Sequence, residues 1–88
     1  MTREEIFKKV QETLIENLDL EESVVTEEAV LSDDLDATSL ELVDLVMDLE
    51  KQLKTRIELE ELTDIETVGD VVDLIKKKIE QTETEQAH

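Results

Sequence analysis

Three signals for helix starts, each followed by apolar residues at helical spacing, constrain the fold of this 88-residue chain more than any other feature. In each signal a Thr precedes an acidic residue by three positions, and the two side chains can satisfy backbone N–H groups that a helix start leaves free. Alternation of polar and apolar residues, which is typical of strands, is almost absent. The sequence therefore predicts an all-α fold. The pairs are Thr2 with Glu5, Thr38 with Glu41, and Thr67 with Asp70.

The apolar residues give the extent of each predicted helix. Helical spacing predicts main helices over residues 2–17, 39–53 and 67–79, and a short helix or turn over residues 59–65. The expected fold is a small four-helix bundle with three main helices and one short helix. The positions at core spacing are Ile6, Val10, Leu14 and Leu18, then Leu42, Leu45, Val46, Leu49 and Leu53, and finally Val68, Val71, Val72, Leu74, Ile75 and Ile79.

A long acidic loop, residues 19–37, connects the first two predicted helices. It is longer than most loops in compact domains, and loops of such length usually have a function or pack against the domain. We expect its apolar residues to hold it against the core. These residues are Val24, Val25, Val30, Leu31 and Leu35.

The chain divides into a helical domain over residues 1–80 and a polar tail over residues 81–88. A chain of 88 residues can enclose one small core, so we expect a single domain. The tail has no apolar stripe to bury and is predicted to be disordered. Its His88 is the one histidine of the chain, and we assign it no role.

The charge is strongly acidic, with 26 Asp and Glu against 9 Lys and Arg and a formal net charge of −17. Between residues 10 and 50 there is no Lys or Arg, although more than half of the acidic residues lie there. Such a chain repels nucleic acid and anionic membrane surfaces. The expected partners therefore have basic surfaces, toward which a field of one sign speeds the encounter.

No Ser-His-Asp or Cys-His set for nucleophilic catalysis is present, because the sequence has no Cys and its one His is His88 in the polar tail. The many carboxylates have no plausible pocket and are read as abundant acidic residues. We therefore predict that the chain is not an enzyme, and that any thiol it uses is supplied by a cofactor. No signal peptide or long apolar run is present, which favours a cytoplasmic monomer without membrane insertion.

Ser39 follows Thr38 and occupies the first position of the helix predicted over residues 39–53. Side chains at this position generally face solvent, and the free N–H groups of the first turn favour a bound anion. A phosphodiester on Ser39 would be well placed there. From these residues alone, an ordinary first-turn serine is the more common explanation.

The same helix has a second apolar set beside Ser39, outside its core stripe. Apolar and acidic residues alternate along this face, and such a mixed surface suits a transient interface with a basic partner. The alternative is that all of the apolar residues belong to the core. The residues of the set are Leu40, Val43 and Met47, interleaved with Glu41, Asp44 and Asp48.

The segment LDATSLELVDLVMDLE, residues 35–50, resembles the prosthetic-group segment of acyl carrier proteins. The helix predicted over residues 2–17 and the run TVGDVVD, residues 67–73, extend the resemblance to nearly the whole chain. Two residues depart from the usual family pattern: Asp36 stands where the family usually has Gly, and Thr38 where it usually has Asp.

The resemblance implies that Ser39 carries 4′-phosphopantetheine and that acyl intermediates are held on this arm as thioesters, in fatty acid biosynthesis. It implies a phosphopantetheinyl transferase and acyl-transferring or acyl-modifying enzymes as partners, with the helix over residues 39–53 as the main recognition helix. It also implies that acyl chains can be sheltered between the helices. Val46 and Ile65 are candidates for the lining.

Two alternatives compete with the carrier. A calcium loop would use Asp34, Asp36 and Thr38, but Ser39 and Leu45 occupy the positions that such a loop gives to Gly and Glu. The second is an unmodified acidic adaptor, or a specialised carrier of a polyketide, peptide or cell-envelope pathway, that docks through residues 39–53. The substitutions at residues 36 and 38 favour this alternative.

Overall fold

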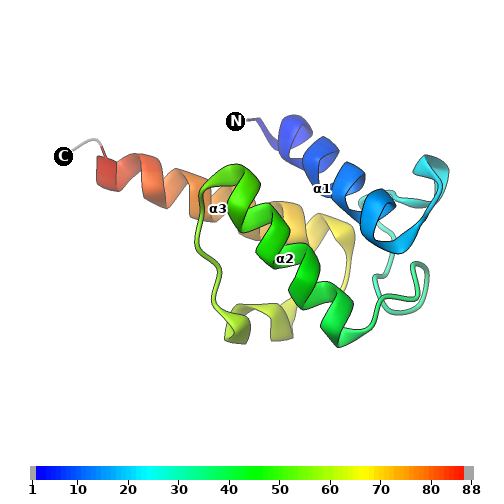
Figure 1. Cartoon of the computed structure of the whole chain (residues 1–88). Coiled ribbons are helices and arrows are strands. Elements are labelled where there is room, and N and C mark those ends of the chain that lie inside the picture. The colour runs from blue at the N-terminus through cyan, green and yellow to red at the C-terminus, as the bar shows by residue number, and fades with distance from the viewer. Residues whose placement is uncertain (1, 87–88) are drawn as a thin grey trace.

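The computed structural model describes residues 2–86, and the side chains among them except those of residue 59 and residues 81–86. Within this part of the chain no strand is present, and the one β-type pairing is an isolated bridge between Val30 and Thr67. The predicted all-α bundle is therefore confirmed (Figure 1). The elements are α1 (Arg3–Leu18), the 3-10 helix η1 (Glu22–Val24), α2 (Ser39–Leu53), the 3-10 helix η2 (Leu59–Asp64) and α3 (Val68–Gln86).

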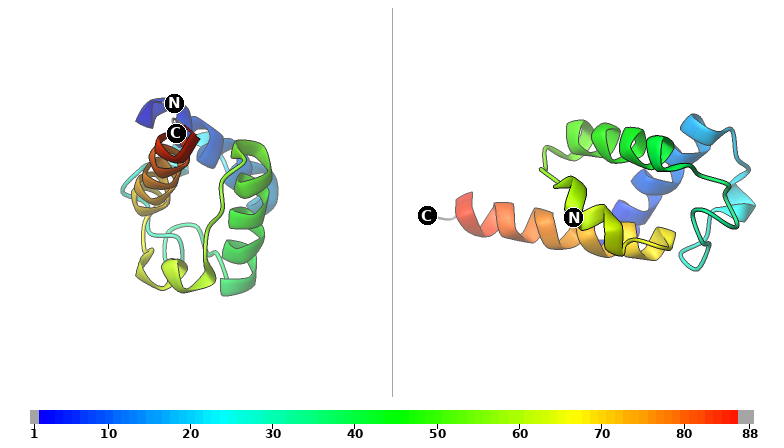
Figure 2. Two further views of the ribbon diagram at one scale, coloured as in Figure 1. Left: turned by 90° about the vertical axis from the view of Figure 1, so that its left-hand side faces the viewer. Right: turned by 90° about the horizontal axis from the view of Figure 1, so that it is seen from below.

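Helix α1 packs against both α2 and α3. The views in Figure 2 show α2 and α3 facing each other across the molecule, with α1 on one side of them and η2 on the other. The C-terminal turns of α3 extend beyond the other helices, and the longest dimension of the molecule is 41 Å. The fourth, short element of the predicted bundle is thus η2, a 3-10 helix.

One apolar core joins the helices. The predicted core positions of α1 and α3 are buried, except that Leu18 and Leu74 are partly buried at its edge. In α2 the fully enclosed side chains are Leu45, Val46 and Leu49, while Leu42 and Leu53 pack against the core from its rim. The spacing of apolar residues by three and four positions therefore predicted the inner face of each main helix correctly.

The long loop is only partly held by apolar side chains. Val25, Leu31 and Leu35 are buried as predicted, but Val24, the last residue of the 3-10 helix η1, is 45% exposed. Ala29, which was not predicted to be in the core, is buried.

Backbone hydrogen bonds complete the attachment of the loop to the start of α3. The amide of Leu31 donates to the carbonyl of Glu66 at 2.9 Å, and the amide of Val68 donates to the carbonyl of Ala29 at 3.0 Å. Val30, which lies between Ala29 and Leu31, forms the isolated bridge with Thr67 and is only partly buried. The loop therefore follows a fixed path to Ser39.

Helix α3 is longer than predicted. Its apolar stripe ends at Ile79, but the backbone continues as a helix to Gln86. The expected tail over residues 81–88 is therefore helical over residues 81–86, while residues 87 and 88 lie outside the described residues. The polar residues Gln, Glu and Thr of this segment can continue a helix that the core has already nucleated.

Candidate functional site

Ser39 is the first residue of α2, as predicted, and its side chain is exposed. The capping box before it is complete, because Thr38 Oγ1 accepts a 3.2 Å hydrogen bond from the amide of Glu41 and Glu41 Oε1 accepts a 3.0 Å bond from the amide of Thr38. The amides of Ser39 and Leu40 have no intrahelical acceptor by their position in the first turn. A group on Ser39 would thus lie at the positive end of the helix dipole.

The turn that leads into α2 requires an unusual backbone. Asp36 has a φ of 55°, in the left-handed region that glycine occupies most easily. Buried Leu35 precedes it, and the amide of Ala37 donates a 2.8 Å hydrogen bond to the carbonyl of Leu31. Asp36 therefore keeps the conformation expected of a glycine at this position and holds Thr38 at the helix start.

A surface hollow of about 360 Å³ lies beside Ser39. Leu31, Ala37, Leu42 and Ile65 provide the apolar part of its wall, and the polar part includes Ser32 and Asp33. Of the two lining candidates from the sequence, Ile65 borders this hollow, whereas Val46 is buried in the core and does not.

Hydrogen bonds to Asp70 fix the segment that brings Ile65 to the hollow. Asp70 Oδ2 accepts from the amides of Glu66 and Thr67 at 3.0 and 3.1 Å. These backbone bonds stabilise the carboxylate and lower the pKa of Asp70 below its usual value. The predicted pair of Thr67 and Asp70 therefore has two effects: it caps α3, and it positions one wall of the hollow.

The six predicted docking residues of α2 differ in how far they face solvent. Leu40 is 78% exposed and Met47 is 50% exposed, and Asp44 between them is also exposed. Val43 is partly buried against the core, so this member of the predicted apolar set is less available to a partner. Glu41 takes part in the capping box described above.

Asp48 is partly enclosed by α1. Its Oδ2 accepts a 3.5 Å hydrogen bond from Asn17 Nδ2. The exposed face of α2 therefore contains fewer residues than the six that were predicted.

This face also continues farther than predicted. Lys51 follows Met47 at four residues and continues the same exposed stripe, and the exposed C-cap Lys54 lies just beyond the end of α2. The same helical spacing that identified Leu40 and Met47 could have found them. They were missed because the prediction stopped where the acidic segment ends.

No cluster of three or more His, Cys, Asp or Glu residues suited to a metal ion is formed by the described residues. Asp34, of the rejected calcium loop, instead has a local role, since its Oδ2 accepts a 2.8 Å hydrogen bond from the amide of Val30. Among the helices of residues 2–86, none is long and apolar enough to cross a membrane.

Residues 8–75 match the family model described as "Phosphopantetheine attachment site". An acyl carrier protein of Thermotoga maritima is 53% identical over 78 residues, which cover 89% of this chain and 96% of the relative. The chain belongs to the acyl carrier protein family. An acyl carrier protein of Petrotoga mobilis is 47% identical over 79 residues, which cover 90% of this chain and 93% of that relative. As a member of this family, the chain is an acyl carrier with covalent 4′-phosphopantetheine as its prosthetic group.

Two solved structures support the assignment of the chain to this family. A crystal structure of an acyl carrier protein from Thermotoga maritima at 2.00 Å has a TM-score of 0.80 and 32% identity, covering 91% of this chain and 93% of that chain. The structure of the acyl carrier protein from Enterococcus faecalis has a TM-score of 0.73 and 38% identity, covering 89% of this chain and 99% of that chain. The resemblance read from residues 35–50 is thereby confirmed for the family and for its fold.

Proposed function

We propose that Ser39 is the residue that carries phosphopantetheine, and that the loaded chain carries acyl intermediates of fatty acid biosynthesis. The observation that supports this most strongly is the placement of Ser39, an exposed hydroxyl at the first position of a capped helix beside a hollow of about 360 Å³. Attachment needs a hydroxyl that an enzyme can reach. The exposed start of α2 meets that need.

The first turn of α2 is suited to the phosphodiester that attachment would create. Ser39 Oγ would form the new bond to phosphorus and give its proton to a base supplied by the transferase. The P–O bond of the phosphoanhydride would break, and its oxygen would leave with the nucleotide part of coenzyme A. The negative charge that remains would lie near the free amides of the first turn, which favour an anion. Thr38 keeps the cap, but it places no charge next to Ser39.

When bound, the prosthetic group supplies a thiol that this Cys-free chain lacks, and acyl groups are held there as thioesters. The hollow offers Leu42 and Ile65 as apolar contacts for the arm or for the start of an acyl chain. Tethering raises the effective concentration of the acyl group at each docked enzyme. The chain itself contributes attachment, shelter and recognition, and we expect it to have no catalytic activity.

The proposed docking surface comprises Leu40, Glu41, Val43, Asp44, Met47 and Asp48. Its exposed apolar members, Leu40 and Met47, would enter shallow pockets, while Asp44 would face basic groups. The partners proposed are a phosphopantetheinyl transferase and acyl-handling enzymes with basic docking surfaces. A monomer in the cytoplasm fits this role.

The test is the intact mass of the protein after incubation with coenzyme A, Mg²⁺ and a broad-specificity phosphopantetheinyl transferase. We expect a gain of one phosphopantetheine group in the wild type and none in Ser39→Ala. Ser32→Ala is the matched control, because Ser32 is also exposed and borders the same hollow. Loading of Ser39→Ala would refute the assignment, and a wild type that no transferase loads would favour an unmodified adaptor.

A further inference from the structure

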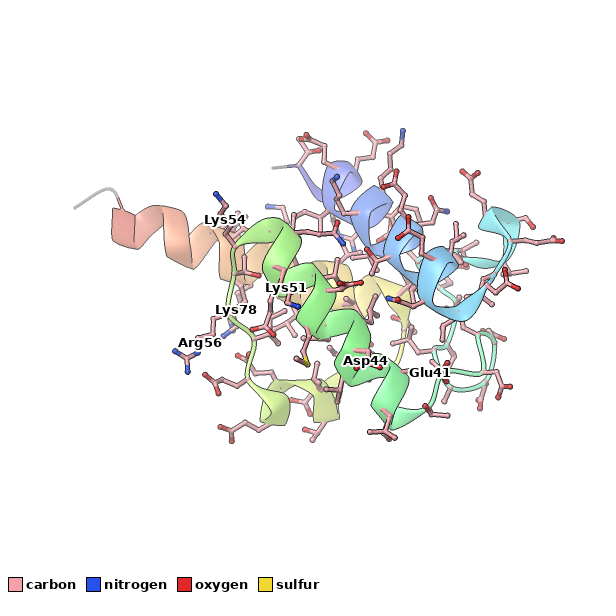
Figure 3. All side chains as sticks on the ribbon, viewed as in Figure 1. Glu41, Asp44, Lys51, Lys54, Arg56 and Lys78 are labelled. Atoms are coloured by element: carbon pink, nitrogen blue, oxygen red, sulfur yellow. The ribbon has the colours of Figure 1, made fainter. Side chains whose placement is uncertain are left out.

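The exposed stripe of α2 changes the sign of its charge along its length. Near Ser39 the charged residues are exposed Asp44 and partly buried Glu41, whereas the last turn has Lys51 and, just beyond the helix, Lys54 and Arg56. Figure 3 shows the two labelled acidic side chains toward one end of α2 and these basic side chains toward the other. The stripe therefore has two poles, although the chain as a whole has a net charge of −17.

The basic pole is available to a partner. Lys51 and Lys54 are exposed, and among the described residues neither forms an ion pair. The side chain of Arg56 is 90% exposed and has only a 3.7 Å contact with Glu58. In contrast, Lys78, which lies at the same end of the molecule in Figure 3, is paired with Glu61 and is largely covered.

Contacts around Glu50 fix the geometry of this pole. The amides of Lys54 and Thr55 donate to the carbonyl of Glu50, and the amide of Ile57 donates to Glu50 Oε2 at 3.0 Å. The chain thus leaves α2 through a left-handed Lys54, with a φ of 54°, along a defined path. The backbone positions of Lys51, Lys54 and Arg56 relative to Ser39 are therefore defined.

We infer that α2 docks the transferase that modifies Ser39 in a single direction, on a face of that enzyme that has basic groups beside its active site and acidic groups farther away. This inference rests on the proposed function. The rise of an α-helix places the centres of the two poles roughly 15 Å apart. Exposed Leu40 and Met47 provide apolar contact along the stripe, and the opposite charges at its ends disfavour the reversed orientation.

Added negative charge at the basic pole has opposite effects on docking in two cases: this two-pole docking and simple attraction to a basic surface. If the partner face were uniformly basic, making the chain still more acidic would speed the encounter. If acidic groups of the partner contact Lys51, Lys54 and Arg56, the same change would weaken docking. Reversing the charges of the basic pole therefore distinguishes the two cases.

The experiment measures kcat/KM for loading by the transferase of the same organism, at several salt concentrations, for Lys51→Glu/Lys54→Glu/Arg56→Glu. The matched control is Lys8→Glu/Lys9→Glu/Lys77→Glu, which makes the same charge change at exposed positions on α1 and α3. We expect the first variant to lose about tenfold in kcat/KM at low salt and less at high salt. The control should load as fast as the wild type or faster.

A milder variant, Lys51→Gln/Lys54→Gln/Arg56→Gln, separates docking from folding, because acidic residues at a helix C-terminus oppose the helix dipole. It should lose several-fold with unchanged circular dichroism and melting temperature. Affinity of the transferase for each variant in a Ser39→Ala background measures docking without modification. Equal or faster loading and equal affinity of both basic-pole variants would overturn the inference. Absence of loading in the wild type would instead count against the proposed function, while the affinities still report on docking.

Discussion

The amide of Gly69 donates a 2.8 Å hydrogen bond to the backbone carbonyl of Glu27, and a Cβ on Gly69 would lie 3.0 Å from the same oxygen. This close approach joins the first turn of α3 to the long loop. Arg3 strengthens the junction from α1, because its guanidinium pairs with both Glu27 and Asp73. A side chain at residue 69 would therefore press on the loop that leads to Ser39.

Gly69→Ala should destabilise the domain by about 1–2 kcal/mol, because the backbone carbonyl of Glu27 cannot move away as a flexible side chain would. Helix propensity alone predicts the opposite, a gain of up to about 1 kcal/mol for Ala in a helix. Urea unfolding followed by circular dichroism measures the difference. An increase in stability would mean that the loop yields easily and does not need this contact.

Asp36→Gly should stabilise the domain by about 0.5–1 kcal/mol, since glycine adopts the left-handed backbone of residue 36 without steric cost. The gain is limited by the greater freedom of glycine in the unfolded chain. Asp33→Gly is the matched control, because it removes the same charge from the same loop at a residue without a positive φ. If both variants gain equally, relief of charge repulsion and not backbone strain is responsible.

Thr13→Val should cost about 1 kcal/mol of unfolding free energy. Thr13 is 2% exposed, its Oγ1 donates to the carbonyl of Lys9 at 2.8 Å, and it accepts a 3.2 Å hydrogen bond from Gln52 Nε2. Valine keeps the shape but removes this polar link between α1 and α2. Thr63→Val, at an exposed threonine of η2, should change stability much less in the same chemical denaturation assay.

Asp70→Asn should lower stability at pH 7 but have little effect in acid. The amides of Glu66 and Thr67 lower the pKa of Asp70 in the folded state, so its contribution to stability is present above the unfolded-state pKa and is lost as the pH falls through the folded-state pKa. Unfolding curves of both proteins should therefore approach each other below about pH 4. A difference that stays constant down to pH 2 would contradict this role, and exposed Asp44→Asn serves as the control.

Leu40→Ala and Met47→Ala should each lower kcat/KM for loading several-fold while changing stability by less than about 0.5 kcal/mol, because both side chains face solvent. Val24→Ala is the matched control, since Val24 is similarly exposed but lies on η1, away from α2. Unchanged loading of the two α2 variants would remove the apolar stripe from the proposed docking surface.

The main helices could be read from the sequence because their signals are local. Thr2 and Thr38 cap helices at the predicted residues, and α2 begins and ends where spacing placed it, at Ser39 and Leu53. The end of α3 was wrong by several residues, because a polar segment without an apolar stripe can still extend a helix already held by the core. The proposal of Ser39 as the attachment residue also came from the sequence, through its cap and the motif around it.

Tertiary structure decided what depends on segments far apart in the chain. Ile65 borders the hollow beside Ser39, and Asp70 holds the segment that contains Ile65 before α3. No local sequence pattern predicts that Ile65 and Ser39 lie close together. The exposure of Val24 and the partial burial of Val43 likewise follow from neighbours that the sequence does not name. The sequence by itself determined the helices, the charge and the candidate attachment residue, since these rest on spacing within a few turns. The loop path, the hollow and the usable width of the α2 face required packing between distant residues.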